Sequence, residues 1–308
     1  MSPTPDTSAS VTASVARLAA QAVLGVGAGT PWRIAAGRSC EAYAVESGEP
    51  GAREWVIRVP VPGTDRSIRF HAEAALGELL ASRGHPVASW EVVDVNGTTC
   101  TVGERLTGNQ IAYETAWTPA FSARLGDLLA DLHGLPTTGF GPLVDDPAAL
   151  RGESRSALDG ALRRWCQAPC WPFDGSDLAD HPVSHLMPEA ASAIAPLEQQ
   201  LLDANEGPIG VVHSDLHHEH LLVGPAGGLT GVLDFGDAFV GSIAWDFAQL
   251  NWYYGPAVSG AVAGRHPDGP ELDERGRLLA AALGIYKLAK SPTDPMVPSR
   301  LQRMLLTR

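Results

Sequence analysis

The sequence predicts an α+β fold in which an antiparallel sheet is followed by a mainly helical part. Short apolar runs at strand spacing, separated by turns with Gly or Asn-Gly, fill much of the first third of the chain. Segments with apolar residues at helical spacing dominate the remainder. With 308 residues, of which 44% are hydrophobic, the chain can form one large domain or two lobes. We therefore expect an N-lobe with a five-stranded sheet and a helix over residues 1–102, and a mainly helical C-lobe over residues 103–308.

An amphipathic helix is expected ahead of the sheet. Apolar residues recur at helical spacing from about residue 8 to residue 24, behind Ser and Thr residues that can cap a helix. Three strands follow, separated by turns that contain Gly, and they predict a meander over residues 32–36, 41–45 and 54–59. The turn between the first two strands contains Ser39.

A second helix and two more strands complete the N-lobe. The helix is expected over residues 67–82, and its buried stripe should consist of Phe70, Ala74, Leu76, Leu79 and Leu80. Strands over residues 90–95 and 99–105 are joined by an Asn-Gly turn, which is a strong signal for a hairpin. The sheet therefore reaches five strands.

The C-lobe should consist of helices around a less regular middle segment. The predicted helices cover residues 121–136, 188–205, 245–253, 272–290 and 297–306, and a polar loop rich in Gly and Pro is predicted over residues 255–271. From residue 137 to residue 185 the Pro, Gly, Asp and Trp content rises and the periodicity fades. In this segment Trp165, Trp171 and Phe173 fit a buried core and a substrate-facing surface equally well.

The composition limits the possible partners and compartments. The formal net charge of −13 disfavours nucleic acid and anionic membrane surfaces, and it favours cationic or neutral small molecules. No apolar run approaches the length of a membrane span, and the N-terminus lacks the pattern of a signal peptide. Cys166 and Cys170 form a C-x-x-x-C pair without the second half of a zinc site. We expect a cytoplasmic protein with reduced thiols, as a monomer or a homodimer.

One stretch, residues 211–246, concentrates the acidic residues and histidines that could carry chemistry. Its first motif, H-x-D-x-x-x-x-H, contains Asp215 and ends at His220. A short apolar strand, a turn rich in Gly and Pro, and a second strand follow, and the second strand ends at Asp234 in D-F-G. The stretch closes with the W-D motif that ends at Asp246. We expect two strands of this kind to bring Asp215 and Asp234 close together.

This stretch closely resembles the catalytic core of the kinase-like phosphotransferases, and more narrowly the aminoglycoside phosphotransferase family, which includes macrolide and related antibiotic kinases. The resemblance covers about residues 32–255 and implies a protein-kinase-like two-lobe fold. It implies that Asp215 orients or deprotonates the acceptor hydroxyl and that Asp234 binds Mg²⁺. His220 stands where the general motif has an Asn metal ligand, and some macrolide and aminoglycoside kinases resemble this chain in that respect.

The resemblance also implies that ATP or GTP binds to the N-lobe. Arg58 occupies the position of the Lys that holds the α and β phosphates in kinases, and Glu73 occupies the position of its ion-pair partner. A guanidinium can bind phosphate oxygens and a carboxylate at the same time, so the role can survive the substitution. Ser39 lies in a turn that resembles the flap over the nucleotide phosphates. Backbone groups near Glu104 and Leu106 resemble the hinge that binds the purine edge.

Four further residues are expected to have supporting roles. His213 should brace the catalytic loop from within, and Asp246 should be a buried structural acid at the start of a helix. His133 should be a packed or capping histidine. Asp237 either faces a cationic or hydroxyl-rich acceptor or caps the next helix.

The function that the resemblance implies is nucleoside-triphosphate-dependent O-phosphorylation of a small hydroxylated molecule. The acceptor could be an aminoglycoside, macrolide or nucleoside-type antibiotic, and its phosphorylation would then confer resistance or self-protection. A metabolite kinase that acts on a sugar amine, choline or homoserine is one alternative. A nucleotide-binding pseudokinase is another, because Arg58 and His220 replace the usual residues.

A zinc hydrolase site is a competing interpretation of the histidine cluster. His213, His217, His218 and His220 could bind zinc together with Asp215, but their spacing fits neither the helical nor the strand pattern of zinc ligands. This hypothesis also leaves the D-F-G motif unexplained. We therefore prefer the phosphotransferase.

Overall fold

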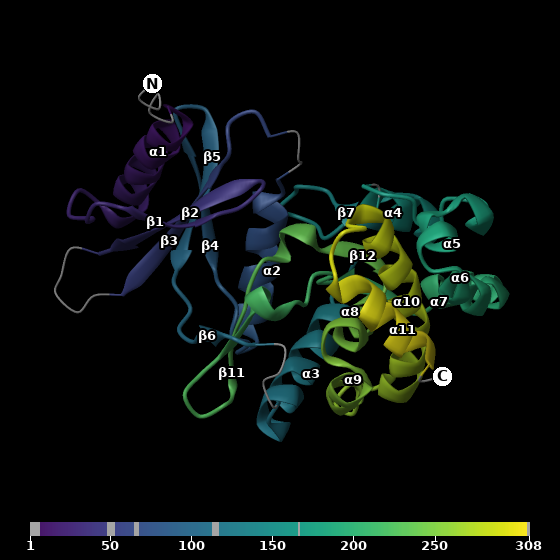
Figure 1. The fold of residues 1–308 in the computed structure, drawn as a ribbon. Coiled ribbons are helices and arrows are strands. Elements are labelled where there is room, and N and C mark those ends of the chain that lie inside the picture. The colour runs from purple at the N-terminus through teal and green to yellow at the C-terminus, as the bar shows by residue number, and fades with distance from the viewer. Residues whose placement is uncertain (1–6, 48–52, 65–67, 113–116, 166, 307–308) are drawn as a thin grey trace. The chain divides into compact units, whose positions relative to one another are not determined.

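A computed structural model describes residues 7–47, 53–64, 68–112, 117–165 and 167–306 (Figure 1). The chain divides into two compact units. The first consists of Met1–Thr107 and Asp145–Ala148, and the second of Gly108–Val144 and Ala149–Arg308. The predicted α+β class is confirmed, because the first unit contains a five-stranded antiparallel sheet and the second is mainly helical.

The first unit is built on five antiparallel strands in the order β1-β2-β3-β5-β4. The strands are β1 (Trp32–Ala36), β2 (Cys40–Glu46), β3 (Glu54–Pro60), β4 (Trp90–Val95) and β5 (Thr98–Glu104). All five lie within one residue of their predicted bounds. Arg58 lies on the central strand β3, opposite Ala42 of β2 on one side and Thr101 of β5 on the other.

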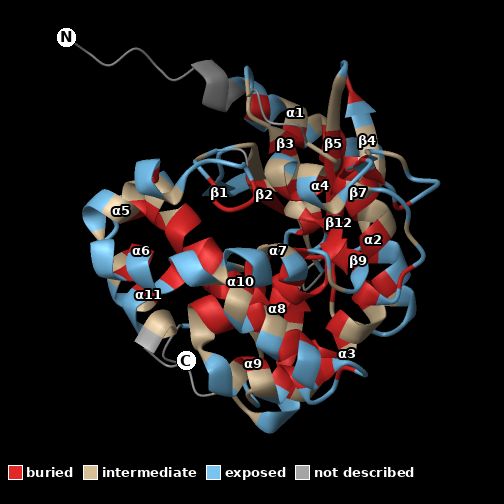
Figure 2. Ribbon diagram, turned by 90° about the vertical axis from the view of Figure 1, so that its right-hand side faces the viewer, coloured by how far each residue is buried: buried red, intermediate tan, exposed pale blue. Residues whose placement is uncertain are grey.

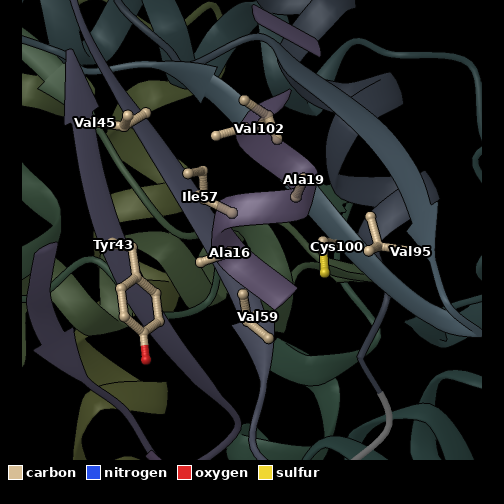
Figure 3. Close-up of a cluster of buried hydrophobic side chains, with 10 residues drawn as sticks. Ala16, Ala19, Tyr43, Val45, Ile57, Val59, Val95, Cys100 and Val102 are labelled. Atoms are coloured by element: carbon tan, nitrogen blue, oxygen red, sulfur yellow. The ribbon is translucent and has the colours of Figure 1, made fainter. Parts of the chain in front are cut away.

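Helix α1 (Thr7–Leu24) covers one face of this sheet (Figure 3). Its Ala16, Ala19 and Ala20 are fully buried, and their small side chains allow the helix to lie close to the strands. The strands contribute Tyr43, Val45, Ile57, Val59, Val95, Cys100 and Val102 to the same core. The first helix is therefore present where the sequence predicts it.

Helix α2 (Phe70–Ser82) begins later than expected, and residue 67 lies outside the described residues. Its buried residues are Phe70, Ala72, Glu73, Leu76, Gly77 and Leu80. The prediction that Leu79 is buried is wrong, because its exposed fraction is 40%. The helix presents Gly77 to the segment ahead of β4, where an added Cβ would lie 2.3 Å from the carbonyl oxygen of Ala88. This close approach turns Leu79 outward.

The second unit combines helices with two small antiparallel sheets. One sheet consists of β6 (Asn109–Gln110), β10 (Leu221–Val223) and β11 (Leu229–Val232), and the other of β7 (Phe140–Leu143), β8 (Gly152–Ser154), β9 (Ile209–Val212) and β12 (Phe239–Ser242). The helices are α3 (Pro119–His133), α4 (Ala157–Arg164), α5 (Pro182–Leu186), α6 (Pro188–Ile194), α7 (Glu198–Asn205), α8 (Ala244–Tyr254), α9 (Pro256–Ala263), α10 (Gly269–Lys290) and α11 (Met296–Leu306). None of the described helices has the length and hydropathy needed to cross a bilayer.

Helices α8 and α10 pack against each other in the core of the second unit, where α8 is largely buried and α10 has both buried and exposed residues (Figure 2). Gly276 of α10 faces Phe247 of α8. A Cβ at this glycine would lie 2.6 Å from the Cβ of Phe247 and 2.9 Å from its backbone carbon. The missing side chain therefore sets the spacing of the two helices.

Two segments of the second unit differ from their predictions. The helix expected over residues 188–205 is divided into α6 and α7, because Pro196 cannot donate a backbone hydrogen bond and a 3₁₀ turn, Ala195–Leu197, replaces the continuous helix. The loop expected over residues 255–271 instead contains α9 and the start of α10. Both helices have Pro in the first turn, at Pro256 and Pro270, where the missing N–H is not needed.

The aromatic residues of the middle segment belong to the core. Trp165, Trp171 and Phe173 are 5%, 3% and 3% exposed. The rings of Trp165 and Phe173 lie 5.2 Å and 5.8 Å from the ring of Trp245, measured between centroids. Of the two interpretations of these residues, core packing is the one that the structure supports.

Replacing Gly276 by Ala should lower the free energy of unfolding by about 1–3 kcal/mol, because the added methyl group overpacks the contact between α8 and α10. Gly260→Ala in α9 is the matched control, since a Cβ there meets only a carboxylate oxygen of Asp273 at 3.9 Å. Ala is the better helix former by about 1 kcal/mol, so the control should be neutral or stabilising. Urea denaturation of both variants measures the difference, and equal stabilities would contradict this account of the packing.

Candidate active site

A hairpin in the second unit brings His220 and Asp234 side by side. Asp215 follows β9, and a 3₁₀ turn, His218–His220, leads into β10. Strands β10 and β11 pair with Leu221 opposite Val232, and Asp234 follows the end of β11. The backbone N–H of Leu233 also donates to the carbonyl oxygen of His220, at 2.9 Å. The antiparallel register thus carries the end of the H-x-D-x-x-x-x-H motif to the D-F-G motif.

His213 braces the loop from within, as expected. Its side chain is fully buried, and its Nε2 lies 2.9 Å from the carbonyl oxygen of Leu233. A carbonyl can only accept, so Nε2 carries the proton, and Nδ1 accepts from the backbone N–H of Asp215 at 3.2 Å. Burial lowers the pKa of His213, which keeps the ring neutral and both bonds intact. The imidazole therefore joins the loop to the end of β11.

Asp246 holds the same loop through hydrogen bonds to its backbone. Its carboxylate is fully buried and accepts hydrogen bonds from the backbone N–H of His213 at 3.0 Å and of Ser214 at 2.8 Å. The Nε2 of His133 lies 3.0 Å from the same carboxylate. A buried carboxylate is stable only when such donors surround it. Asp246 is therefore a buried structural acid at the start of α8, as predicted, and His133 is packed against it.

The carboxyl group of Asp215 stays ionised well into the acidic range. Burial raises its pKa, but the hydrogen bond with His217 and the electrostatic interactions with His220, His217 and Arg164 outweigh burial and hold the pKa below its usual range. The carboxylate oxygen Oδ2 lies 3.6 Å from Nε2 of His217 and 3.8 Å from Nδ1 of His220. Its side chain is 27% exposed, so a small molecule can reach it.

His220 lies between the two acids. Its Nδ1 lies 2.8 Å from the carbonyl oxygen of Asp215, so Nδ1 is the protonated nitrogen of the neutral ring. The other nitrogen, Nε2, then has a lone pair directed at Oδ2 of Asp234, 3.4 Å away. Asp234 has a left-handed backbone conformation, with φ of 61°, and its carboxylate accepts from the N–H of Gly236. Two electron-rich atoms that face each other in this way suit a cation between them.

The zinc interpretation can be tested on the same atoms. Asp215, His217 and His220 do offer ligand atoms within 4.8 Å of one another. However, Nδ1 of His217 accepts from the backbone N–H of Glu219, and Nδ1 of His220 donates to the carbonyl of Asp215. These bonds leave Nε2 of His217 as a donor toward Asp215 rather than as a metal ligand. The loop therefore favours hydrogen bonding within itself over a three-ligand zinc site.

Arg164, at the end of α4, ties the loop that follows β9 to Asp237. Its Nε donates to Oγ of Ser214 at 2.8 Å, and one terminal nitrogen donates to the Ser214 carbonyl and to Asp237, both at 3.2 Å. The alternative in which Asp237 caps a following helix is wrong, because the chain continues into β12. Asp237 is 45% exposed, and Arg164 is 12% exposed. The ion pair positions Ser214, the neighbour of Asp215.

The first unit holds the other predicted pair. Arg58 of β3 donates to Oε1 of Glu73 of α2 at 2.6 Å. The Glu73 side chain is only 2% exposed, and the guanidinium also lies 5.4 Å and 5.3 Å from the ring centroids of Phe70 and Trp90. The ion pair therefore joins β3 to α2 through the two residues that the sequence predicts as partners.

The other residues of the first unit that were predicted to bind the nucleotide are Ser39, Glu104 and Leu106. Ser39 lies in the turn between β1 and β2, and its carbonyl oxygen accepts from the N–H of Val61 at 2.8 Å. Glu104 ends β5, and its carboxylate pairs with Arg53 at 2.9 Å. Leu106 follows the sheet and is half-buried. The Glu104 side chain is engaged on the surface, so only its backbone is a candidate for contacting a base.

Arg164 was not singled out from the sequence, and His217 was named only as a candidate zinc ligand, yet both contact the candidate site. Arg164 has its partners Ser214 and Asp237 50 and 73 positions later, and nothing local distinguishes it from Arg163, which pairs with Asp159 on the surface. His217 carries a weak signal, because it stands two positions after Asp215 in a cluster of histidines.

Comparison with known proteins supports the same assignment of the fold. The sequence matches the family described as the phosphotransferase enzyme family, APH, over residues 32–283. No curated protein matches it significantly. Among solved structures, a ternary complex of a thermostable mutant of aminoglycoside phosphotransferase APH(4)-Ia with AMP-PNP and hygromycin B is similar at 18% identity and a TM-score of 0.66, covering 96% of this chain and 98% of that one.

Two further solved structures are similar over nearly the whole chain. The ADP-bound aminoglycoside phosphotransferase APH(2'')-Ib has 15% identity and a TM-score of 0.56, with 96% of this chain and 97% of that one covered. The GDP complex of aminoglycoside 2'-phosphotransferase-IIIa has 15% identity and a TM-score of 0.58, with coverages of 94% and 96%. Identities this low establish a shared fold. Together with the family match over most of its length, they show that the chain belongs to the APH phosphotransferase family.

Proposed function

We propose that this protein transfers a phosphoryl group from a nucleoside triphosphate to a hydroxyl of a small molecule. One observation carries the proposal: the imidazole of His220 lies between Asp215 and Asp234, at 3.8 Å and 3.4 Å from their carboxylate oxygens. Phosphoryl transfer needs a carboxylate that orients the acceptor hydroxyl and cations that neutralise the triphosphate. The two acids and His220 supply groups for both tasks.

Asp215 is the residue that would hold the acceptor hydroxyl. Because its pKa lies below the usual range, the carboxylate is ionised at neutral pH and accepts the hydroxyl's hydrogen bond. A carboxylate with a lowered pKa is also a weak base. Its main contribution is therefore to orient the oxygen for attack, which suits a loose transition state in which the proton leaves late.

The donor set fits Mg²⁺. Asp234 provides a carboxylate, and His220 provides a nitrogen whose lone pair is directed at that carboxylate. Mg²⁺ prefers oxygen ligands and retains several waters, so one carboxylate and one neutral ligand, with phosphate oxygens, are sufficient. When bound, the ion would neutralise charge on the triphosphate. His220 contributes to this role only while Nε2 is unprotonated, because a proton and a metal ion compete for the same lone pair.

We assign nucleotide binding to the N-lobe, residues 1–102, and the acids and the acceptor to the C-lobe, residues 103–308. The ion pair of Arg58 and Glu73 supports a role for Arg58 in holding phosphates, since a guanidinium has donors left over after pairing with one carboxylate. Ser39 would lie in the flap over the phosphates. The backbone near Glu104 and Leu106 would bind the purine of ATP or GTP.

The proposed setting is the cytoplasm, with the protein acting as a monomer or a homodimer. The similar solved structures are aminoglycoside phosphotransferases, one of them in a complex with hygromycin B, which supports an antibiotic-like acceptor and a role in resistance or self-protection. Asp237 would contact acceptor hydroxyls from its position beside Ser214.

Asp215→Asn and Asp234→Asn should each lower turnover by at least about 10³-fold while the protein stays folded, because each removes a charge that transfer requires. Phosphoryl transfer to an acceptor panel measures turnover, and circular dichroism checks the fold. Glu189→Gln, on the exposed face of α6, is the charge-matched control and should change neither. Full turnover in either aspartate variant would remove that residue from the mechanism. Nucleotide binding by the wild type without transfer to any acceptor would favour a pseudokinase.

His220→Asn should retain most of the Mg²⁺-dependent turnover, because an amide oxygen is a harder ligand that suits Mg²⁺. His220→Ala should raise the Mg²⁺ concentration required for half-maximal turnover by at least about tenfold. Wild-type protein should use Mn²⁺ relatively better than the Asn variant does, since imidazole is the softer ligand. Metal titrations after chelation measure both effects, and an unchanged Mg²⁺ requirement in the Ala variant would separate His220 from the metal.

Asp246→Asn should reduce both stability and turnover. The amide would direct an NH₂ group at backbone N–H donors that now face a carboxylate oxygen, at a cost of about 2–4 kcal/mol in the free energy of unfolding. Since Asp246 holds the backbone of His213 and Ser214, kcat should fall more than the acceptor KM changes. Urea denaturation and steady-state kinetics test both parts, and a destabilised variant with normal kcat would show that the loop keeps its geometry without this contact.

A further inference from the structure

Cationic side chains gather near Asp215 in the second unit. Lys287 of α10 lies close enough for the charges of Asp215, Arg164 and Arg300 to act on its ammonium group. Arg164 also acts on Asp215 itself, and Arg300 of α11 acts on His218 of the catalytic loop. Helices α4, α10 and α11 therefore each direct a positive charge toward this loop.

Lys287 is held by an aromatic ring rather than by an acid. Its Nζ donates to the hydroxyl of Tyr253 at 2.8 Å and lies 5.1 Å from the centre of that ring. The guanidinium of Arg300 lies 5.6 Å from the same ring centre. Tyr253 in turn is 6.0 Å from the ring of His217, which contacts Asp215. One tyrosine thus places two cations near the loop that carries Asp215.

The charge of Lys287 is poorly compensated. Among the described residues it forms no ion pair with a carboxylate. Burial, helped by the charges of Lys290, Arg164 and Arg300 and opposed by Asp215, lowers its pKa to about 8. At neutral pH the ammonium is therefore still charged, and the one carboxylate acting on it is the group that the proposed reaction uses to hold a hydroxyl.

The residue type at this position is also informative. Lys287 and Lys290 are the only lysines in the sequence, which otherwise uses arginine for its positive charges. An ammonium is a compact donor whose three hydrogens can turn toward a ligand, whereas a guanidinium is planar and larger. The lysines of this chain are thus confined to the last turn of α10, and Lys287 is the one that faces Tyr253.

We propose that the acceptor carries an anionic oxygen group, a carboxylate or a phosphoryl group, which Lys287 and Arg300 bind beside Tyr253 while Asp215 holds the hydroxyl. The inference rests on the proposed phosphotransferase function and narrows its acceptor class. A polycationic aminoglycoside or choline would bring positive charge toward these cations. A hydroxylated amino acid such as homoserine, a sugar acid or a sugar phosphate would bring the complementary charge.

Matched acceptors test the charge requirement directly. Glycerate and glycerol 3-phosphate should each be phosphorylated with a KM at least about tenfold below that of glycerol, and the better of the two identifies the anionic group. Lys287→Met should raise the KM of the preferred anionic acceptor by at least about tenfold, and Lys287→Arg should restore part of this loss. Lys290→Met is the control, because this lysine lies one turn further on α10 and is exposed. It should change the KM by less than about twofold.

A second measurement does not depend on turnover. With lysine labelled by ¹³C at Cε, the wild type gives two signals, and Lys287→Met identifies the one that belongs to Lys287. Glycerate or glycerol 3-phosphate should raise the pKa of Lys287 by about one unit, because a bound anion favours the protonated ammonium, and glycerol should not. The titratable and charged groups that face Lys287 are Asp215, Arg164, Tyr253, Lys290 and Arg300.

The outcomes separate this inference from the proposed function. Phosphorylation of an aminoglycoside with a lower KM than any anionic acceptor, or an unchanged KM in Lys287→Met, would overturn the anion site and leave the phosphotransferase intact. A pKa of Lys287 that responds equally to glycerol and to both anions would overturn it as well. If no acceptor is phosphorylated but the anions raise this pKa, the proposed function fails and the anion site stands.

Discussion

The buried carboxylate of Asp246 is the interaction on which the candidate active site depends. It accepts the backbone N–H groups of His213 and Ser214 and contacts Nε2 of His133, and no part of it reaches solvent. His133 is itself contacted by His266, whose Nδ1 accepts from the backbone of Asp268, so each proton in this chain of imidazoles points toward the carboxylate. Burial and His133 lower the pKa of His266 to about 4, which keeps it neutral. A buried anion thus holds the loop of the candidate active site through neutral donors, and losing one donor there would leave the charge unpaired.

The rest of the site follows from strand pairing. The register of β10 and β11 brings His220 to Asp234, and Nε2 of His213 reaches Leu233, the residue before Asp234. The backbone carbonyl of Asp215 accepts from Nδ1 of His220 and thereby orients the imidazole ring. Three residues that differ in chemistry are therefore positioned by backbone hydrogen bonds. This arrangement lets the side chains remain available to a ligand while their geometry is fixed by the fold.

These local determinants explain what could be predicted from the sequence. The five strands and the H-x-D and D-F-G motifs have short-range signals, and the strand bounds were correct to within one residue. Leu79 was misplaced because helical periodicity does not reveal which side a glycine presents to its neighbour. The contact of Arg164 with Ser214 spans fifty positions and that of Lys287 with Tyr253 spans thirty-four, so neither leaves a local pattern. A cation on an amphipathic helix has the same sequence signal whether it faces solvent or an active site.

The net charge of the chain is likewise a poor guide to the charge of the acceptor. A value of −13 predicts cationic or neutral partners, yet charges separated by more than about 10 Å are largely screened at physiological salt. A ligand beside Asp215 therefore experiences the nearby groups far more than the acidic residues elsewhere on the chain. Among the strongest influences on Lys287, one is an acid and three are cations. The acid is the group that would bind the acceptor hydroxyl, so the three cations are the charges left to contact the rest of the acceptor, and this local arrangement, rather than the overall charge, would select it.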